Sequence, residues 1–495
     1  MSLLLIDKLQ SHAVERPADV AVRQVAPRDG LTLTWHELAR RVNLLAAALR
    51  RDLPAGAVVM LCSGNRPEYT VAFLGCLASG MTVFPVAPDI AGPELLAAAQ
   101  RSKAAALVAI GQAIPVAREV FASANAFHDL APDAVLHSLP QWEIPPGSGA
   151  ALLLLSSGTT GRPKIVRRDG ASLDAVSSAM VDAIRFTAAD RVLAAVPLCH
   201  SYGLEHGLLA PTWAGSGVHL CDGFDLLIAF SQLVGDTGVP GVTLFPGVPF
   251  MFEMLCSAGH SLGKLPTLRR AYSAGGPLPR ALFDAFDRKF ATPVAQLYGA
   301  TEIGSVTFND PAIDPFDPAS VGRPMSGVSI RIVDPQQLQI ARPLEAGGEG
   351  HVAIHAASML SGYLDGDDPP MQDGYFLTGD LGRVDASGAL TITGRIKLLI
   401  DVGGRKVNPI EVEEVLSRHP SVGACVVVPL WVSQTLSRLK AIVTPARPGE
   451  ALDVRALRQF ARAHLSAYKV PRVFEVRESL PRSAAGKVLR QQVEN

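Results

Sequence analysis

The chain has 495 residues, of which 48% are hydrophobic and 18% are charged. One hydrophobic core rarely grows beyond about 250–300 residues, so we expect a globular protein of at least two domains and not a disordered one. The 45 Lys and Arg residues nearly balance the 46 Asp and Glu residues, and no long basic run occurs. Neither nucleic acid nor an anionic membrane is therefore expected as a main partner.

The 6 cysteines are scattered without a Cys-x-x-Cys pair. This argues against a zinc cluster or a disulfide framework and favours a reducing, cytoplasmic location. The N-terminal stretch MSLLLIDKLQSH has no basic segment before its apolar part and reaches Asp7 at once, unlike a secretory signal. The longest uncharged run, 69–88, contains Gly75, Gly80 and Pro85. It is better interpreted as a buried helix and a buried strand, so we expect no membrane span.

The first predicted helix begins at a capping box, Thr34 with Glu37, and apolar residues then recur on one helical face as far as Leu49. Strands and helices alternate after it. Strands are predicted at 57–64, 81–86, 104–110 and 151–155, and helices from about 67 and over 93–102. Further strands are predicted at 192–197, 217–221, 241–245 and 269–273. This alternation predicts an α/β body with a largely parallel sheet that runs to about residue 390.

The pattern changes after that body. The stretch 394–408, GRIKLLIDVGGRKVN, leads into a helix with Asn408 as N-cap and Pro409 at the first helical position. Predicted strands at 423–429, 439–445 and 472–476 and a helix near 453–465 follow. This is the pattern of a small α+β module of roughly a hundred residues. We place the boundary at 394–397, which gives an N-terminal domain of 1–394 and a C-terminal domain of 395–495.

The run SSGTTGRPK, residues 156–164, directly follows the predicted strand ALLLL. Glycines let the backbone curl so that several N–H groups converge on one anion, while the hydroxyls and Lys164 add donors and charge. The run therefore indicates a phosphate-binding loop, although neither a Walker loop nor Gly-x-Gly-x-x-Gly occurs in the chain. A polar surface turn remains the alternative interpretation of this run alone.

Further short motifs suit the same chemistry. YGATE (298–302) combines an aromatic ring, a turn glycine, a hydroxyl and a carboxylate, which suits a base, a phosphate and Mg²⁺. YFLTGD (375–380) ends in an acid that can accept hydrogen bonds from a ribose diol, and GRIK (394–397) adds cations. LPRSAAGKVLR (480–490) places a lysine in a flexible Ala/Gly setting. Each motif alone is usually a cap or a turn, but together and in this order they are specific.

With these motifs, the whole chain resembles the adenylate-forming superfamily of acyl- and aryl-CoA synthetases, firefly luciferase and peptide-synthetase adenylation domains. The resemblance implies a large N-terminal α/β domain with layered sheets and helices, which binds ATP and a carboxylic acid. It also implies a small, mobile C-terminal α+β domain that turns about a hinge near Lys397 between two half-reactions. The implied enzyme is an AMP-forming acid–CoA ligase with ATP, Mg²⁺ and coenzyme A.

The resemblance also implies roles for single residues around the nucleotide. The phosphate loop that it implies comprises Ser156, Ser157, Gly158, Thr159, Thr160, Gly161 and Lys164. Gly275, Gly276 and Pro277 would line one face of the adenine, with Tyr298 on the other. The adjacent Gly299 is a further cofactor-binding candidate. One departure is Ile165, which follows Lys164 where the family commonly has glycine.

The remaining implied roles concern catalysis. Thr301 would contact the α-phosphate, Glu302 would hold Mg²⁺, and Asp380 and Arg395 would bind the ribose. Lys487 matches the catalytic lysine of adenylation, although an isolated lysine would ordinarily be a solvated surface residue. Gly403 and Gly404 fall in the loop that lines the thiol tunnel. No Gly-x-Ser-x-Gly elbow supports a serine hydrolase, and a non-catalytic homologue would be expected to have lost Glu302, Asp380 or Lys487.

The motif PLCHSYG (197–203) resembles the acid-pocket motif, with His200 at the gating aromatic position; a packed core histidine is the alternative. The candidate pocket residues are His200, Tyr202, Phe245, Ser273, Ala274 and Gly299. They are small or aromatic and suit an aryl acid or a medium-length acyl chain. PLCHSYGL lacks the aspartate with which amino-acid activators of the family usually hold the ammonium group. The acceptor is expected to be CoA, with an acyl-carrier protein as the alternative.

Overall fold

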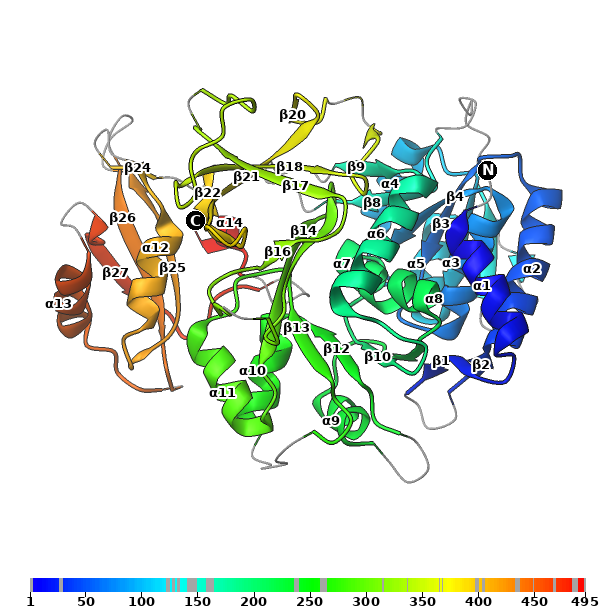
Figure 1. Ribbon diagram of the computed structural model, residues 1–495, viewed down its shortest axis with the longest axis horizontal. Coiled ribbons are helices and arrows are strands. Elements are labelled where there is room, and N and C mark those ends of the chain that lie inside the picture. The colour runs from blue at the N-terminus through cyan, green and yellow to red at the C-terminus, as the bar shows by residue number, and fades with distance from the viewer. Residues whose placement is uncertain are drawn as a thin grey trace. The chain divides into compact units, whose positions relative to one another are not determined.

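The computed structural model describes residues 3–25, 30–121, 125–126, 130, 134–139, 149–156, 164–235, 240–258, 265–313, 316–335, 337–364, 366, 368–396, 400–402, 406–431, 437–447, 449–465, 469–482 and 488–493. Its contacts divide the chain into two compact units. The large unit comprises Met1–Ser329 and Ile354–Phe376, and the small unit comprises Ile330–Ala353 and Leu377–Asn495. Figure 1 shows the elements of both units. The domain boundary at 394–397 and the hinge near Lys397 stay predictions.

The first sheet of the large unit has nine strands. In spatial order they are β16 (Arg323–Pro324), β15 (Gly304–Asn309), β14 (Val294–Ala300), β13 (Arg270–Ser273), β12 (Leu244–Gly247), β10 (Arg191–Ala194), β11 (Gly217–Leu220), β1 (Val20–Gln24) and β2 (Thr32–Thr34). The pairs from β14 to β1 are parallel, whereas β15, β16 and β2 pair antiparallel. The antiparallel strand β15 turns the chain back after YGATE, which places that motif in a tight turn.

The second sheet has eight strands. Their spatial order is β19 (Gly362–Tyr363), β9 (Ile165–Arg168), β8 (Leu152–Leu155), β4 (Thr82–Val86), β3 (Val58–Cys62), β5 (Ala106–Ile110), β7 (Ala134–Ser138) and β6 (Asn125–Ala126). The central strands β8, β4, β3 and β5 are parallel and almost wholly buried, as expected for a sheet covered on both faces. The predicted α/β fold with a largely parallel sheet is confirmed in the centre of both sheets, and the edges are antiparallel.

Helices cover these sheets (Figure 1). They include α1 (Leu4–Glu15), α2 (Trp35–Asp52), α3 (Pro67–Ser79), α4 (Gly92–Ser102), α5 (Ile114–Val120), α6 (Gly170–Ile184), α8 (Ala210–Ala214), α9 (Leu226–Val234), α10 (Pro249–Ser257) and α11 (Arg280–Phe290). The predicted capping box of α2 is confirmed, because Glu37 N–H donates to Thr34 Oγ1 (3.3 Å) and Thr34 N–H donates to Glu37 Oε2 (3.0 Å). The uncharged run 69–88 forms most of α3 and all of β4, as predicted. None of the described helices is long and apolar enough to cross a membrane.

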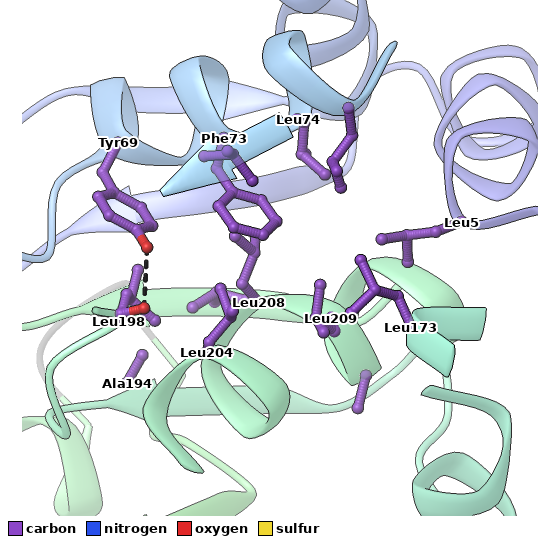
Figure 2. Packing of buried hydrophobic residues seen from close by; sticks show 14 of the residues in the cluster. Leu5, Tyr69, Phe73, Leu74, Leu173, Ala194, Leu198, Leu204, Leu208 and Leu209 are labelled. Carbon is purple, nitrogen blue, oxygen red and sulfur yellow. Dashed lines mark hydrogen bonds between the residues drawn. The ribbon is translucent and has the colours of Figure 1, made fainter. Parts of the chain in front are cut away.

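The largest core cluster of the large unit joins α3 to the segment that follows β10 (Figure 2). Tyr69 and Phe73 of α3 point toward Leu198 and Leu208, and all four side chains are buried. The Tyr69 hydroxyl donates a hydrogen bond of 2.8 Å to the Leu198 carbonyl. This core contact therefore holds the backbone directly before the predicted acid-pocket residue His200.

The small unit contains a three-stranded sheet of β25 (Val422–Trp431), β26 (Ser437–Pro445) and β27 (Val473–Val476), with helices α12 (Pro409–Ser417), α13 (Val454–His464) and α14 (Arg490–Val493). Its hydrophobic core lies between this sheet and α12 and α13. The predicted cap of α12 is confirmed, since Ile410 N–H donates to Asn408 Oδ1 (3.0 Å) and Pro409 occupies the first turn. The chain therefore has a large N-terminal and a smaller C-terminal domain.

Several strands contribute residues to both units. They are β17 (Val328–Val333), β18 (Gly350–Ala356) and β21 (Tyr375–Val384). Within the large unit, β20 (Met371–Gln372) pairs with the first residues of β21. Within the small unit, β22 (Leu390–Arg395) pairs with the remainder of β21, and β23 (Ile400–Asp401) pairs with β24 (Lys406–Val407).

Candidate active site

The predicted phosphate loop connects two antiparallel strands. Leu155 at the end of β8 lies opposite Ile165 at the start of β9, and Ser156 N–H donates to the Lys164 carbonyl (2.9 Å). The buried strand ALLLL thus ends where the polar run begins. Ile165 is fully buried in a core cluster, so this position serves packing where the resemblance leads us to expect glycine. Five further loop residues lie outside the described residues: Ser157, Gly158, Thr159, Thr160 and Gly161.

The motif YGATE occupies the end of β14 and the turn into β15. Ile303 N–H donates to the Ala300 carbonyl (3.1 Å), and Gly304 has φ +72°, a conformation that glycine adopts without strain. Thr301 and Glu302 are consequently half-buried in the turn. Tyr298 is half-buried in β14, and the next residue, Gly299, is exposed. The turn therefore presents a hydroxyl and a carboxylate side by side.

Tyr363 of β19 contacts both Lys164, the last residue of the predicted phosphate loop, and the Thr301–Glu302 turn. Its hydroxyl donates to Glu302 Oε1 (3.3 Å), and Lys164 Nζ lies 4.4 Å from the centre of its ring, within cation–π distance. The strand pairing of β19 with β9 holds Tyr363 opposite Val166. Sequence reasoning did not single out Tyr363, because an isolated tyrosine followed by a loop carries no local signal of either contact.

The donor set at Glu302 fits magnesium. In the part of the chain that the structure describes, no group of three His, Cys, Asp or Glu side chains could hold a metal ion by itself. Mg²⁺ is usually held by one or two carboxylates together with substrate phosphates and water, and not by a protein cage. A single carboxylate such as Glu302, acting together with substrate phosphates and water, would therefore be sufficient.

The predicted adenine segment follows β13. Ser273 and Ala274 are buried, whereas Gly275, Gly276 and Pro277 are exposed. Gly275 has φ +81°, and a Cβ built on Gly276 would have Pro249 Cγ, 4.0 Å away, as its nearest contact. The backbone of this segment is therefore accessible from outside, as an approach by a flat ring requires.

The hydroxyl of Ser273 is buried, and none of the described residues forms a hydrogen bond with it. Tyr202 lies close by, since its hydroxyl donates to the carbonyls of Gly247 (3.1 Å) and Tyr272 (3.3 Å). Phe245, another pocket candidate, is fully buried, and its ring packs against Phe252 at 5.3 Å. Its predicted role in the acid pocket stays a prediction.

His200 is exposed at the start of α7 (Ser201–Leu204), so it is not a packed core histidine. Although the residue as a whole keeps solvent-accessible surface, protein atoms pack around part of the imidazole; this desolvation lowers its pKa from the usual value, and the Asp89 carboxylate opposes the shift. His200 lines a pocket of about 300 Å³ at the carboxyl ends of β4 and β8. The other described residues that line it are Pro85, Val86, Ala87, Asp89, Ile90, Glu94, Leu155 and Cys199.

Asn65 fixes the backbone that leads to His200. Its amide nitrogen donates to the carbonyls of Ala194 and Val196 (both 3.0 Å), and its amide oxygen accepts from Leu198 N–H (2.8 Å). The neighbouring Cys199 is buried, which raises the pKa of its thiol to about 12. A protonated thiol is a weak nucleophile, so Cys199 behaves as a small apolar residue.

The small unit contains the predicted ribose-binding pair. Asp380 of β21 lies opposite Arg395 of β22, and Arg395 Nε donates to Asp380 Oδ1 (2.5 Å). Gly379 N–H donates to Nε2 of the buried His351 (2.8 Å), and burial lowers the pKa of this histidine. His351 thus holds the backbone next to Asp380 and was not anticipated from the sequence. Lys397, Gly403, Gly404 and Lys487 lie outside the described residues.

Comparison with known proteins agrees with this architecture. The model of the AMP-binding enzyme family matches residues 9–364, and that of the AMP-binding enzyme C-terminal domain matches residues 411–487. A feruloyl-CoA synthase of an Amycolatopsis species is 30% identical over 97% of each chain. A fatty acid–[acyl-carrier-protein] ligase, ScoC of Streptomyces coeruleorubidus, is 29% identical over 99% of this chain and 95% of that protein. The crystal structure of ATP-bound MatB from Rhodopseudomonas palustris is 25% identical, covers 100% of this chain and 98% of that one, and has a TM-score of 0.86.

The chain therefore belongs to the family of AMP-binding enzymes. It is an AMP-forming enzyme of the acid–CoA ligase type and binds ATP.

Proposed function

We propose that this protein activates an aryl or medium-chain carboxylic acid as its acyl-AMP, releasing pyrophosphate, and transfers the acyl group to the thiol of CoA. The junction of Lys164, Tyr363 and Glu302 carries this proposal. It brings a cation at the base of the polar loop and a carboxylate suited to Mg²⁺ onto one aromatic side chain. This cation and this carboxylate suit a nucleoside triphosphate whose phosphates lie between a cationic loop and a metal ion.

The first half-reaction makes the acid reactive. A carboxylate is a poor acyl donor because its leaving group would be oxide. One carboxylate oxygen forms a bond to the α-phosphorus of ATP, and the bond from that phosphorus to pyrophosphate breaks. Lys164 and the polar loop would hold the β- and γ-phosphates, Thr301 the α-phosphate, and Lys487 the charge between carboxylate and α-phosphate. Mg²⁺ held by Glu302 would neutralise phosphate charge when bound.

Asp380 and Arg395 of the small unit would bind the ribose diol. The Arg395 guanidinium donates to one carboxylate oxygen of Asp380, and a carboxylate can accept several hydrogen bonds, including those of sugar hydroxyls. Gly275, Gly276 and Pro277, whose backbone is exposed, would face the adenine, with Tyr298 opposite.

The second half-reaction consumes the mixed anhydride. The thiol loses its proton, its sulfur forms a bond to the acyl carbon, and AMP leaves with the bonding electrons of the acyl–oxygen bond. Gly403 and Gly404 would line the path of the pantetheine arm. We assign no residue as the base for the thiol.

The acid itself is proposed to lack an α-ammonium group. No aspartate occurs in PLCHSYGL to bind such a group. Tyr202, Ser273 and Ala274 lie close together and offer an aromatic face, a small surface and one buried hydroxyl without a partner among the described residues. A planar acid with one polar group fits this set, because a buried hydroxyl is most stable when a ligand completes its hydrogen bonding.

An acyl-carrier protein is the second candidate acceptor. The similarity to ScoC, which spans nearly the whole of both chains, favours it. CoA and a carrier protein present the same pantetheine thiol, so the two acceptors differ in the surface that surrounds the arm and not in the chemistry.

A pyrophosphate-release screen with aryl acids, medium-chain acids and amino acids tests the proposal. We expect release that depends on ATP, Mg²⁺ and an aryl or acyl acid, and thioester formation when CoA is added. Activity with amino acids alone would contradict the substrate class. Thioester formed readily on a carrier protein but not on CoA would establish the alternative acceptor.

A further inference from the structure

A charged pair is fully buried inside the large unit, away from the solvent. Arg168 at the end of β9 and Glu205 have side chains that are 0% and 2% exposed, and Arg168 Nη1 donates to Glu205 Oε1 (2.7 Å). Glu205 begins the π-helical turn η2 (Glu205–Leu209), directly after the PLCHSYGL motif. A buried carboxylate is costly unless every lone pair finds a partner. Neither residue has a role in the proposed mechanism.

Glu205 is bound on both of its oxygens. Oε1 also accepts from Ser201 Oγ (3.0 Å), and Oε2 accepts from the backbone N–H (3.0 Å) and the hydroxyl (2.7 Å) of Ser305. Gly304 permits this approach, since a Cβ there would lie 3.2 Å from both Arg168 Nη2 and Glu205 Oε1. The Glu205 carboxylate therefore holds β15 at Ser305, which directly follows the Thr301–Glu302 turn and Gly304.

His206, the next residue, extends the network to another strand. Its Nε2 lies 3.0 Å from Ser305 Oγ, and its Nδ1 lies 3.1 Å from the Tyr272 hydroxyl. Burial lowers the pKa of His206 to about 4, so the ring is neutral and carries one N–H. Tyr272 immediately precedes Ser273, the last residue of β13, and Ala274 follows the strand.

The directions of these hydrogen bonds follow from the carboxylate. Glu205, paired with Arg168, can only accept, so the Ser305 hydroxyl donates to it. Ser305 Oγ then accepts from His206 Nε2–H, which leaves Nδ1 to accept from the Tyr272 hydroxyl. Each described member has its hydrogen bonds completed by the next, and such chains of buried hydrogen bonds hold a single geometry.

We propose that His206 is a positioning residue of the adenylation site: through Tyr272 it sets the acid-binding segment Ser273–Ala274, and through Ser305 it sets the Thr301–Glu302 turn. The Arg168–Glu205 pair anchors this hydrogen-bond network at its other end. This inference rests on the proposed function, and it adds residues to which the proposed mechanism assigns no contact with substrate or metal. It also explains why an apolar helix contains adjacent Glu and His residues.

The two arms of the network predict different kinetic effects. Tyr272→Phe removes one hydroxyl and keeps the ring, so the KM for the acid should rise by roughly threefold to tenfold, the size of one hydrogen bond, with the KM for ATP unchanged. Ser305→Ala should raise the KM for MgATP by roughly the same factor and leave the KM for the acid unchanged. His206→Leu should raise both values, and His206→Gln, which keeps a donor and an acceptor, should restore part of each.

His219→Leu is the matched control. His219 is buried in β11, its pKa is also lowered to about 4, and its partner is Gln232 (2.7 Å). This variant should lower the melting temperature as His206→Leu does, and it should change neither KM. The proposal would be overturned if Tyr272→Phe and His206→Leu lowered the melting temperature but kept both KM values of the parent. The network would then serve stability alone.

The parent protein is assayed first, which separates this inference from the proposed function. If the parent releases no pyrophosphate with any acid, the proposed function is wrong. The positioning role is then measured by calorimetric titration with MgATP. Weaker binding in Ser305→Ala and His206→Leu than in His219→Leu supports the role, and equal affinities in the three variants refute it.

Discussion

Two arginine–glutamate pairs join distant parts of this chain, one in each unit. Arg168 and Glu205 in the large unit are 37 residues apart, and their side chains are 0% and 2% exposed. Arg490 and Glu413 in the small unit are 77 residues apart, and their side chains are 24% and 13% exposed. The first pair is surrounded by the protein on all sides, whereas water reaches the second.

The partners differ as well. Glu205 accepts four hydrogen bonds that connect three motif-bearing segments. Glu413 accepts from Arg490 and from Val427 N–H (2.6 Å), and burial raises its pKa although Arg490 opposes the shift. We conclude that the buried pair belongs to the hydrogen-bond network that fixes the interior of the large unit. The small-unit pair fastens the C-terminal segment to α12 and β25, close in sequence to the predicted catalytic Lys487.

Loss of one partner from the buried pair should produce the largest effect. Arg168→Leu leaves the Glu205 carboxylate uncompensated, so the free energy of unfolding should fall by about 3–5 kcal/mol. Denaturant unfolding measures this change. The surface variant Arg51→Leu, whose side chain is 73% exposed, is the control and should change stability by less than about 0.5 kcal/mol.

The double variant Arg168→Leu with Glu205→Leu removes both charges and should recover part of the lost stability. If Arg168→Leu were as stable as the parent, the buried pair would contribute no more to the free energy of unfolding than a surface pair does, contrary to our expectation.

The small unit is expected to affect rate more than stability. If Lys487 is the proposed donor for the developing charge, Lys487→Ala should slow adenylation by about 10²–10³-fold with the melting temperature unchanged. Thiol transfer from pre-formed acyl adenylate should proceed at near the parent rate. The two half-reactions are measured separately, and equal slowing of both would show that the lysine does not act in adenylation alone.

Acid should weaken the large unit through its buried histidines. The pKa of His206 is lowered to about 4, below its unfolded value of roughly 6.5, so the unfolded state binds more protons between these pH values. The stabilisation is complete above pH 6.5 and is lost as the pH falls toward 4, by up to about 3 kcal/mol. Tyr202 and Tyr272 pack against the ring, and Glu205 is the neighbouring carboxylate that favours its charged form.

Urea unfolding at pH 4.5, 5.5 and 6.5 measures this dependence. His206→Gln should flatten the pH slope of the unfolding free energy, and the remaining slope should include that of His219, whose pKa is lowered equally. An unchanged slope in His206→Gln would mean that this ring does not titrate as its burial requires.

Loss of the partly exposed pair should have the smallest effect of the four. Glu413→Gln removes the charge but leaves an amide oxygen, and water can reach Arg490, so we expect a loss of about 1–2 kcal/mol. Glu475→Gln is the matched control, because Glu475 pairs with Lys440 and Arg477 at the surface. Its effect should stay below about 0.5 kcal/mol. Equal effects in the two variants would erase the distinction between an anchoring pair and a surface pair.

The sequence anticipated much of the fold because its signals are local. The capping box of Thr34 and Glu37, the Asn408–Pro409 helix start and the apolar strand before Ser156 each lie within a few residues, and the structure has all three. Periodicity over such windows reflects backbone geometry directly. The edge strands of both sheets were not anticipated, since short strands such as β19 are defined by their partners and not by their own residues.

Candidate site residues were predicted by motif, and their roles stay predictions. The sequence by itself determined the family, the α/β class and the residue types that suit phosphate, ribose and metal, because those depend on short ordered strings. Only the tertiary structure placed Tyr363 between Lys164 and Glu302 and joined Arg168, Glu205 and Ser305. Glu205 and Ser305 are 100 residues apart, and Lys164 and Tyr363 are farther apart still. No local pattern specifies a contact whose two ends meet only after the sheets have packed.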